Sequence, residues 1–365
     1  MAFITLNKKK LRENYGKLDA LFRSKNIEWA VVSKLLCGNK KYLEAVIDLG
    51  VTQICDSRVT NLKAIKAIKP SIETVFIKPP AKRSIQGVVE FADISFNTEL
   101  QTIRLLSDAA VKMGKIHKVV IMIELGELRE GVMREHLVDF YSDIFKLPGI
   151  EVIGIGTNLT CMYGVLPNHD KLIQLCIYKQ LIETKFNRKI PYVSGGASVT
   201  IPLIENGLLP AGVNHFRVGE TLYLGTDVYH NTTFDQMHND VFKLYAEVIE
   251  VNEKPMVPMG ELGHNLTGDV LQFDQQSASG SAHRAIVDVG LLDIEAEHFK
   301  PVEADMHIVG SSSDMTVIDL GSNKKGIKTG DLIEFKMDYM GILRIMHSKY
   351  IDKKFETEVK PYTEA

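Results

Sequence analysis

The chain has little cysteine, almost no net charge and no long apolar run. Its four cysteines follow no repeated spacing, which disfavours a disulfide framework and favours a reducing compartment. Its 43 basic and 46 acidic side chains leave a net charge of −3, so electrostatics gives no reason to expect a nucleic acid or a membrane surface as a partner. Neither a signal-peptide region nor a bilayer-spanning run is recognisable. We therefore expect a cytoplasmic protein without nucleic-acid or membrane partners.

The 11 histidines do not point to a metal site. They are scattered, with no His-x-x-x-His pair and no histidine–carboxylate cluster at ligand spacing. We therefore expect no metal centre, and the functional residues must be of other types.

Short apolar runs alternate with helical stretches over the first two thirds of the chain. Leu11, Leu18 and Phe22 recur at helical spacing and predict an amphipathic helix over residues 8–24. The apolar runs predict eight strands, at residues 29–34, 52–55, 74–78, 94–97, 118–124, 152–156, 191–194 and 215–218. Strict alternation of strand and helix predicts a parallel sheet, and eight such units predict a closed (β/α)8 barrel over residues 1–235.

The pattern changes near residue 235. The remaining apolar runs are short, alternate in polarity and are separated by Gly, Ser and Asp. They predict strands at residues 243–251, 284–289, 306–309, 316–320, 331–336 and 342–346. We therefore expect a mostly β C-terminal domain over residues 236–365.

The run Trp29-Ala30-Val31-Val32-Ser33-Lys34 is central to the functional prediction. It is typical of a buried parallel strand that ends on a lysine. Because (β/α)8 barrels keep their active sites at the C-terminal ends of the strands, Lys34 is expected at the barrel mouth. Arg129, Asn158 and Arg217 follow later strands on the same rim. The alternative is a strand-end lysine that only reaches for solvent.

Two glycine-containing turns on this rim suit a phosphate. Gly195-Gly196-Ala197-Ser198 opens a helix, whose free N–H groups and dipole favour an anion, although a plain turn also explains the Gly-Gly pair. Gly219 and Glu220 follow the last strand, and phosphate sites after strands seven and eight recur in such barrels. A phosphorylated cofactor beside one reactive lysine points to pyridoxal phosphate (PLP), bound as a Schiff base.

Four segments then carry a family resemblance that covers nearly the whole chain. They are Val32-Ser33-Lys34, Glu124-Leu125-Gly126-Glu127-Leu128-Arg129-Glu130-Gly131, the run from His215 to Gly225, and Ser313-Asp314-Met315-Thr316-Val317-Ile318-Asp319. The sequence resembles the alanine-racemase-type, fold-type III family of PLP enzymes. Within it, the ornithine-racemase-like branch is closer, through Cys37-Gly38-Asn39, Thr157-Asn158-Leu159-Thr160-Cys161 and Ser194-Gly195-Gly196. The resemblance implies a head-to-tail homodimer in which each C-terminal domain contributes to the partner subunit's active site.

The resemblance also implies roles for single residues. Lys34 would carry PLP and serve as a base on one face of the substrate Cα, and Arg129 would lie near the phenolic oxygen or the substrate carboxylate. Arg217 would face the pyridine nitrogen and keep it unprotonated, because a guanidinium is effectively never deprotonated. That pattern favours racemisation over transamination. Asn158 would support Arg217, and the phosphate would be bound by Gly195, Gly196, Ser198, Gly219 and Glu220.

Two tyrosines of the family are missing. The position four residues after the lysine holds Gly38, and the Gly-Tyr-x-Asp segment of the second domain reads Gly290-Leu291-Leu292-Asp293. The donor of the second proton therefore stays open. The candidates are Tyr339 and Asp314 from a partner subunit and Cys161 from the barrel, with a packed aromatic, a turn-capping carboxylate and a buried thiol as the structural alternatives.

The predicted function is a PLP-dependent amino-acid racemase with a small amino acid as its substrate, either a basic one such as ornithine or lysine, or alanine. An acidic rim of Glu124, Glu127 and Glu130 would suit a cationic side chain, unless these are ordinary loop charges. A non-catalytic PLP carrier is an alternative that the missing tyrosines favour and the extra β domain disfavours. A PLP decarboxylase or lyase is a further alternative, which Arg217 disfavours.

Overall fold

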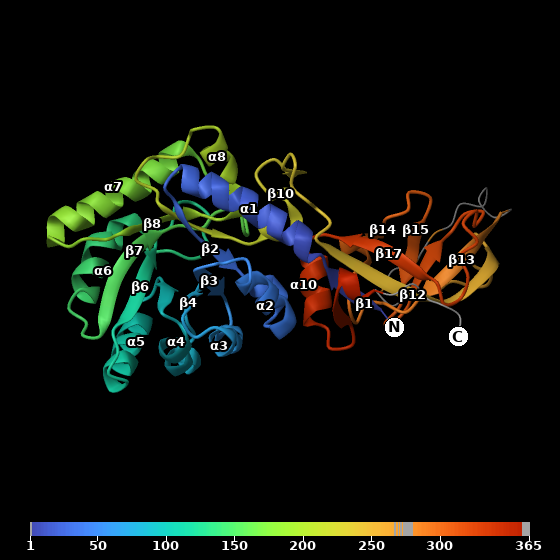
Figure 1. Ribbon diagram of the computed structural model, residues 1–365, viewed down its shortest axis with the longest axis horizontal. Helices are drawn as coiled ribbons and strands as arrows, with labels where there is room; N and C mark the ends of the chain where they lie inside the picture. The colour runs from blue at the N-terminus through green and yellow to red at the C-terminus, as the bar shows by residue number, and fades with distance from the viewer. Residues whose placement is uncertain (1, 266–267, 269, 271, 273–279, 360–365) are drawn as a thin grey trace. The chain divides into compact units, whose positions relative to one another are not determined.

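The computed structural model describes residues 2–265, 268, 270, 272 and 280–359. The chain divides into two compact units (Figure 1). One comprises residues 11–239, and the other combines residues 1–10 with residues 240–365. Within the described ranges, no helix has both the length and the apolar character that a membrane crossing requires.

Eight parallel strands of the first unit close into a barrel, which confirms the predicted (β/α)8 fold. The strands are β2 (Glu28–Val32), β3 (Gln53–Asp56), β4 (Glu73–Phe76), β5 (Ile94–Asn97), β6 (His117–Met122), β7 (Ile150–Gly156), β8 (Tyr192–Gly196) and β9 (His215–Val218). Each strand pairs with the next, and β9 pairs with β2 to close the ring. All eight lie where the apolar runs predicted them, because strands that are buried on both faces read as continuous apolar sequence.

Helices cover the outside of the barrel strands (Figure 1). They are α1 (Lys8–Ser24), α2 (Lys40–Ile47), α3 (Val59–Ile68), α4 (Ile85–Phe91), α5 (Leu100–Lys112), α6 (Leu137–Ile144), α7 (His169–Phe186), α8 (Ile201–Glu205) and α9 (Glu220–Leu224). Short 3-10 turns at Lys34–Leu36, Lys82–Ser84, Arg134–His136 and Ser198–Thr200 lie between strands and helices, and a two-stranded ribbon, β10 (Thr226–Asp227) and β11 (Thr232–Thr233), follows α9. Apolar positions such as Leu11, Leu18 and Phe22 are buried, as their helical spacing predicted.

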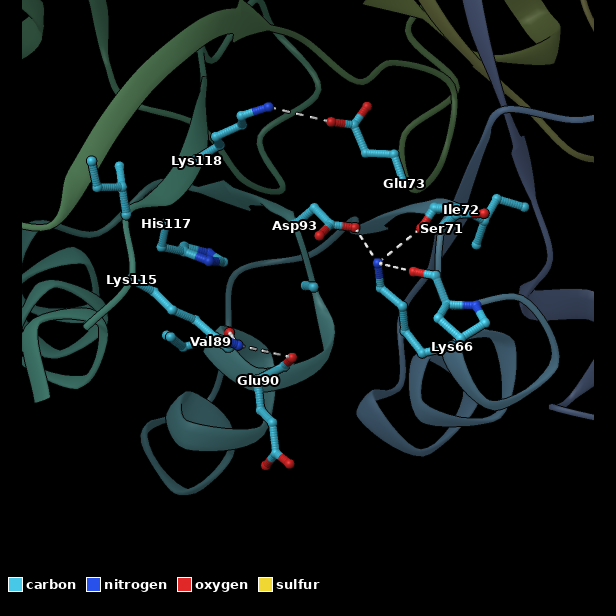
Figure 2. A pocket seen from close by; sticks show the side chains of 13 residues that line it. Lys66, Ser71, Ile72, Glu73, Val89, Glu90, Asp93, Lys115, His117 and Lys118 are labelled. Carbon is cyan, nitrogen blue, oxygen red and sulfur yellow. Dashed lines mark hydrogen bonds and ion pairs between the residues drawn. The ribbon is translucent and has the colours of Figure 1, made fainter. Parts of the chain in front are cut away.

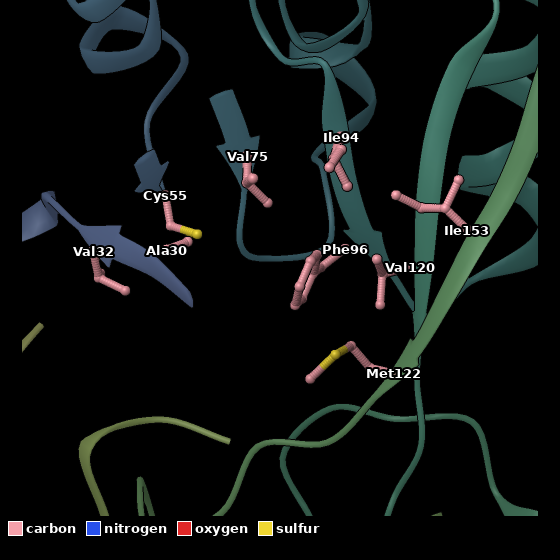
Figure 3. Packing of buried hydrophobic residues seen from close by; sticks show 9 residues of the cluster. All are labelled: Ala30, Val32, Cys55, Val75, Ile94, Phe96, Val120, Met122 and Ile153. Carbon is pink, nitrogen blue, oxygen red and sulfur yellow. The ribbon is translucent and has the colours of Figure 1, made fainter. Parts of the chain in front are cut away.

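The barrel interior is filled by side chains from alternate strand positions (Figure 3). The cluster consists of Ala30, Val32, Cys55, Val75, Ile94, Phe96, Val120, Met122 and Ile153. Each member is at most 7% exposed, so the barrel has a packed core rather than a pore. Burial of each large side chain contributes about 1.5–3 kcal/mol to stability. This core gives the C-terminal rim a rigid base.

The second unit is built around a mostly antiparallel sheet in the order β14-β17-β12-β13-β16-β15. Its strands are β12 (Phe242–Pro255), β13 (Ser281–Val287), β14 (Phe299–Pro301), β15 (His307–Ser311), β16 (Thr316–Asp319), β17 (Leu332–Met337) and β18 (Asp352–Phe355). The first strand of the chain, β1 (Phe3–Leu6), belongs to this sheet. It pairs antiparallel with β12 and parallel with β18. The N-terminal residues therefore fold with the C-terminal sheet, which sequence patterning did not indicate.

The predicted strand at 342–346 is wrong, because this stretch lies in helix α10 (Tyr339–His347). The carboxylate of Asp338 caps the helix by accepting a hydrogen bond from the backbone N–H of Gly341, at 2.8 Å. Ile342, Ile345 and Met346 are buried at a spacing of three and four residues, which is the helical period. A short apolar run does not by itself distinguish a strand from a helix, and here the cap decides.

Candidate active site

Lys34 lies at the C-terminal end of β2, on the first residue of the 3-10 turn that follows the strand. Its side chain is exposed, whereas the preceding Ser33 is fully buried. The Ser33 hydroxyl donates a hydrogen bond to the Asp56 carboxylate at 2.8 Å. Ser33 thereby ties the end of β2 to the end of β3, and the backbone that carries Lys34 is fixed at the barrel mouth.

Asp56 is a buried carboxyl group next to this lysine that sequence patterning missed. It accepts hydrogen bonds from Ser33, from Nδ2 of Asn61 at 3.0 Å and from the backbone N–H of Arg58 at 3.0 Å. Burial raises the pKa of Asp56, although these donors oppose the shift. The available signal was an aspartate that closes a buried strand, but its partners lie on other segments.

Arg217 is buried inside the barrel at the end of β9. Its guanidinium donates to the hydroxyl of Ser194 and, at 2.8 Å, to the backbone carbonyl of Thr157. It also lies over the ring of Phe96, 4.9 Å from the ring centroid. Burial lowers the pKa of Arg217 to about 10, so the group remains a cation at neutral pH. Arg217 is therefore a fixed positive charge that packs on the ring of Phe96.

A chain of buried hydrogen-bonded side chains supports Arg217. The Ser194 hydroxyl lies 2.7 Å from Nδ1 of His215, and Nε2 of His215 lies 2.8 Å from Oε1 of Gln53. Burial lowers the pKa of His215 to about 3, and the charge of Arg217 lowers it further in the same direction. His215 is therefore neutral at physiological pH and serves as a hydrogen-bonding support rather than as a second cation.

Arg129, Asn158 and Cys161 gather beside Arg217. Nδ2 of Asn158 lies 3.1 Å from Sγ of Cys161. Arg129 pairs with the carboxylate of Glu130, which raises the pKa of Arg129, and the Cys161 thiol contributes to the same shift. Cys161 and Arg129 also act electrostatically on Arg217, so these groups share one mouth.

The loop that carries Cys161 closes around the carboxylate of Glu127. The side chain of Glu127 is 1% exposed. It accepts five backbone hydrogen bonds, from Thr160, Cys161, Met162, Tyr163 and Val165. Burial alone raises the pKa of Glu127, but the N–H donors outweigh burial and hold it at about 2.

The hypothesis of an acidic rim is wrong for Glu127, since both oxygens of its carboxylate accept hydrogen bonds from backbone N–H groups. Glu124 and Glu130 also bind groups of their own loop, the one that follows β6. Glu130 binds Arg129, and Oε1 of Glu124 accepts from the backbone N–H of Gly126 at 2.5 Å.

The two glycine-containing turns lie against each other. Ser198 is buried, and its hydroxyl accepts a hydrogen bond from the backbone N–H of Thr221 at 3.1 Å. Gly196 has φ +151°, and a Cβ atom there would collide with Thr200. Gly219 precedes Glu220, the first residue of α9. The N-terminal ends of these two short helical segments therefore lie at one place on the rim.

Gly195 is required for packing on the other side of its turn. A Cβ atom there would overlap the side chain of Val213. The remaining candidates, Tyr339 and Asp314, belong to the C-terminal unit. Tyr339 is the first residue of α10, and Asp314 is exposed and accepts a hydrogen bond from Ser313 at 2.9 Å.

A cavity of about 490 Å³ opens at the other end of the barrel (Figure 2). It is lined by residues that precede β4, β5 and β6 and by the first residues of β4 and β6. Its lysines contact protein acceptors: Lys66 lies 2.6 Å from the Asp93 carboxylate, and Lys118 lies 3.5 Å from that of Glu73. Because active sites of such barrels lie at the C-terminal rim, this cavity is a structural feature of the bottom face.

Comparison with known proteins identifies the family of the chain. A family model described as "Alanine racemase, N-terminal domain" matches residues 6–227. The ornithine racemase of Acetoanaerobium sticklandii is 36% identical over 352 residues, which cover 96% of this chain and 98% of that protein. The lysine racemase of Thermotoga maritima is 30% identical over 358 residues, or 98% and 99% of the two chains.

Solved structures share the fold. The alanine racemase from Bartonella henselae with covalently bound pyridoxal phosphate superimposes with a TM-score of 0.73 at 16% identity, covering 97% of this chain and 99% of that one. The closed barrel and the mostly antiparallel C-terminal sheet define the alanine racemase fold. The chain belongs to the alanine racemase family, and it is an amino-acid racemase.

Proposed function

We propose that this chain is a PLP-dependent racemase of a basic amino acid such as ornithine or lysine, with Lys34 joined covalently to the cofactor. The observation that carries the proposal is Arg217, a buried cation fixed by Ser194 and Thr157 on the rim that also bears Lys34. The names of the two full-length relatives support the substrate class.

The donors on the rim fit the cofactor. Arg217 presents a planar cation toward the barrel mouth, where a pyridine nitrogen would accept a hydrogen bond. The turns around Ser198 and Gly219 supply backbone N–H groups for the phosphate, together with Gly195, Gly196 and Glu220. Arg129 is held by Glu130 and supplies a second cation for an oxygen of the cofactor or for the substrate carboxylate.

Each residue then has a defined task in racemisation. When bound, PLP withdraws the electron pair that is left on Cα after its proton departs. Nζ of Lys34 removes or returns the Cα proton on one face of the substrate. Arg217 keeps its own proton at neutral pH, because its pKa stays near 10, and so does not donate one to the ring. Weaker electron withdrawal favours prompt return of a proton to Cα.

Racemisation needs a proton donor on the opposite face, and we assign this role to Cys161. Its thiol lies beside Asn158 and Arg129 in the same unit as Lys34. Tyr339 and Asp314 remain the candidates that a partner subunit would contribute in a head-to-tail homodimer. We expect that dimer, and a cytoplasmic location.

The test uses a panel of single enantiomers incubated with the PLP-loaded protein in deuterated water. Deuterium at Cα together with inversion is the expected result, and it should be fastest for ornithine or lysine. Release of CO₂ would identify a decarboxylase. A cofactor that binds without any exchange would identify a PLP carrier.

A further inference from the structure

The backbone of the loop between β7 and α7 is hydrogen-bonded to one acidic side chain. Glu127 follows β6, and its carboxylate accepts backbone hydrogen bonds at 2.5–3.1 Å from five residues of this loop, Thr160 to Tyr163 and Val165. Successive backbone N–H groups that converge on one point form an anion-binding nest. Here the anion is supplied by the protein itself.

The loop backbone is held in a conformation that needs such an anchor. Thr160 has φ +60°, a left-handed value that costs free energy for a residue with a branched side chain. Its hydroxyl donates to the backbone carbonyl of Val165 at 2.8 Å, which closes the loop on itself. Without the carboxylate, five backbone N–H donors of one loop would lose their acceptor together.

The anchored loop carries two residues of the proposed site. Asn158 and Cys161 contact each other at 3.1 Å, and Cys161 lies against Arg129. The N–H of Cys161 is itself bound to Glu127 at 2.8 Å, so the position of the thiol follows that of the carboxylate. Since Glu127 is 1% exposed, its carboxylate acts through the loop and not on the substrate.

We propose that Glu127 is a positioning residue for racemisation, whose carboxylate fixes the 160–165 loop and thereby holds the Cys161 thiol at the reacting face. This inference rests on the proposed function, because it assigns Cys161 to one of two proton-transferring faces. Glu127 thereby lets a loop without regular secondary structure carry a residue that must be placed within a fraction of an ångström.

The first test does not require activity. Amide hydrogen exchange, followed by mass spectrometry on the unloaded protein, reports the protection of residues 160–165. We expect protection in the wild type and at least about a tenfold faster exchange in Glu127→Gln, which puts an NH₂ group among N–H donors. Equal exchange in the two proteins would overturn the anchoring role.

Glu183 offers a matched control. Its carboxylate also accepts a backbone N–H, from Ile190 at 2.7 Å, and it lies at the far end of α7. Glu183→Gln makes the same chemical change at a distance from the rim. It should leave both the exchange of residues 160–165 and the racemase activity unchanged.

The second test separates the two faces. For each enantiomer, the rate at which Cα exchanges hydrogen for deuterium is measured in the PLP-loaded wild type, Glu127→Gln and Glu127→Asp. We expect Glu127→Gln to lower the exchange of one enantiomer, and the racemisation kcat, by about 10- to 100-fold, with a smaller change in KM. Exchange of the other enantiomer, which depends on Lys34, should persist. Aspartate keeps the charge and should restore part of the loss.

A purely structural role predicts a different result, in which Glu127→Gln slows both enantiomers equally. That outcome would overturn the proposal even if the loop loses protection. A wild-type protein that neither exchanges nor racemises any amino acid would instead refute the proposed function. The amide exchange would then decide the anchoring role by itself.

Discussion

A side chain at Gly38 would collide with Asn61. A Cβ atom there would lie 2.6 Å from Oδ1 of Asn61, and Gly38 has φ +74°, which favours glycine. Asn61 in turn donates to Asp56, which accepts from Ser33 beside Lys34. The position at which the family resemblance places a tyrosine thus lies against Asn61 of α3, and the glycine is a packing requirement.

Gly38→Ala is therefore expected to lower stability for two reasons. The left-handed backbone costs about 1–2 kcal/mol with a side chain. The contact with Asn61 should add about 1 kcal/mol, because the amide must leave its hydrogen bond to Asp56. Denaturant unfolding of both proteins measures the difference.

Gly50 is the matched control for this substitution. It has φ +90°, and a Cβ atom there meets no atom of the described structure within 4 Å. Gly50→Ala should show the backbone cost alone. Equal losses in the two variants would mean that Asn61 moves aside freely and that the contact is unimportant.

Lys34→Ala should abolish covalent attachment of PLP. Absorbance near ~420 nm, typical of a lysine-bound cofactor, should be absent, and racemisation should fall by at least about 1,000-fold, since both the attachment and one base are lost. Lys40→Ala is the control, because Lys40 is an exposed lysine nearby whose ion pair with Glu44 spans 3.8 Å. Retained activity in Lys34→Ala would refute the proposed mechanism.

Two buried histidines should make the barrel sensitive to acid. Burial lowers the pKa of His215 to about 3 and that of His117 to about 4, against 6.5 in the unfolded chain. The unfolded chain therefore binds these protons first as the pH falls. Their contribution is complete above pH ~6.5 and is lost toward pH ~4, at up to about 1.4 kcal/mol per pH unit for each histidine.

The two histidines also form a controlled pair. Each lies 2.7 Å from a serine hydroxyl, His117 from Ser95 and His215 from Ser194. His117→Gln and His215→Gln should both flatten the loss of unfolding free energy between pH 6.5 and 4. Only His215→Gln should reduce activity, because Ser194 also binds Arg217. Equal activities would show that the polar chain does not support the cation.

The barrel could be predicted from the sequence, but the contacts at its rim could not. Eight strands and most helices follow from apolar periodicity, which is a local property and therefore legible in one sequence. The partners of Glu127 lie 33 to 38 residues away, and the carbonyl that binds Arg217 lies 60 residues away. Such pairings depend on how the strands close, and α10 was misread because its capping contact was not considered.

The charge of Arg217 is expected to control which reaction the site performs. Arg217→Gln keeps an amide donor for the carbonyl of Thr157 and the hydroxyl of Ser194 but removes the cation. With no cation opposite it, the ring nitrogen is free to take a proton, and electron withdrawal from Cα becomes stronger. Racemisation should slow by about 100-fold, and a larger share of turnovers should end in transamination.

The measurement is the ratio of racemised amino acid to keto acid formed over a fixed time. Ser194→Ala is the control, because it removes one partner of Arg217 and leaves both the charge and the contact to Thr157. We expect it to slow the reaction without raising the share of keto acid. If Arg217→Gln and the wild type gave the same ratio, the cation would be needed only to orient the cofactor, and the preference for racemisation would have another cause.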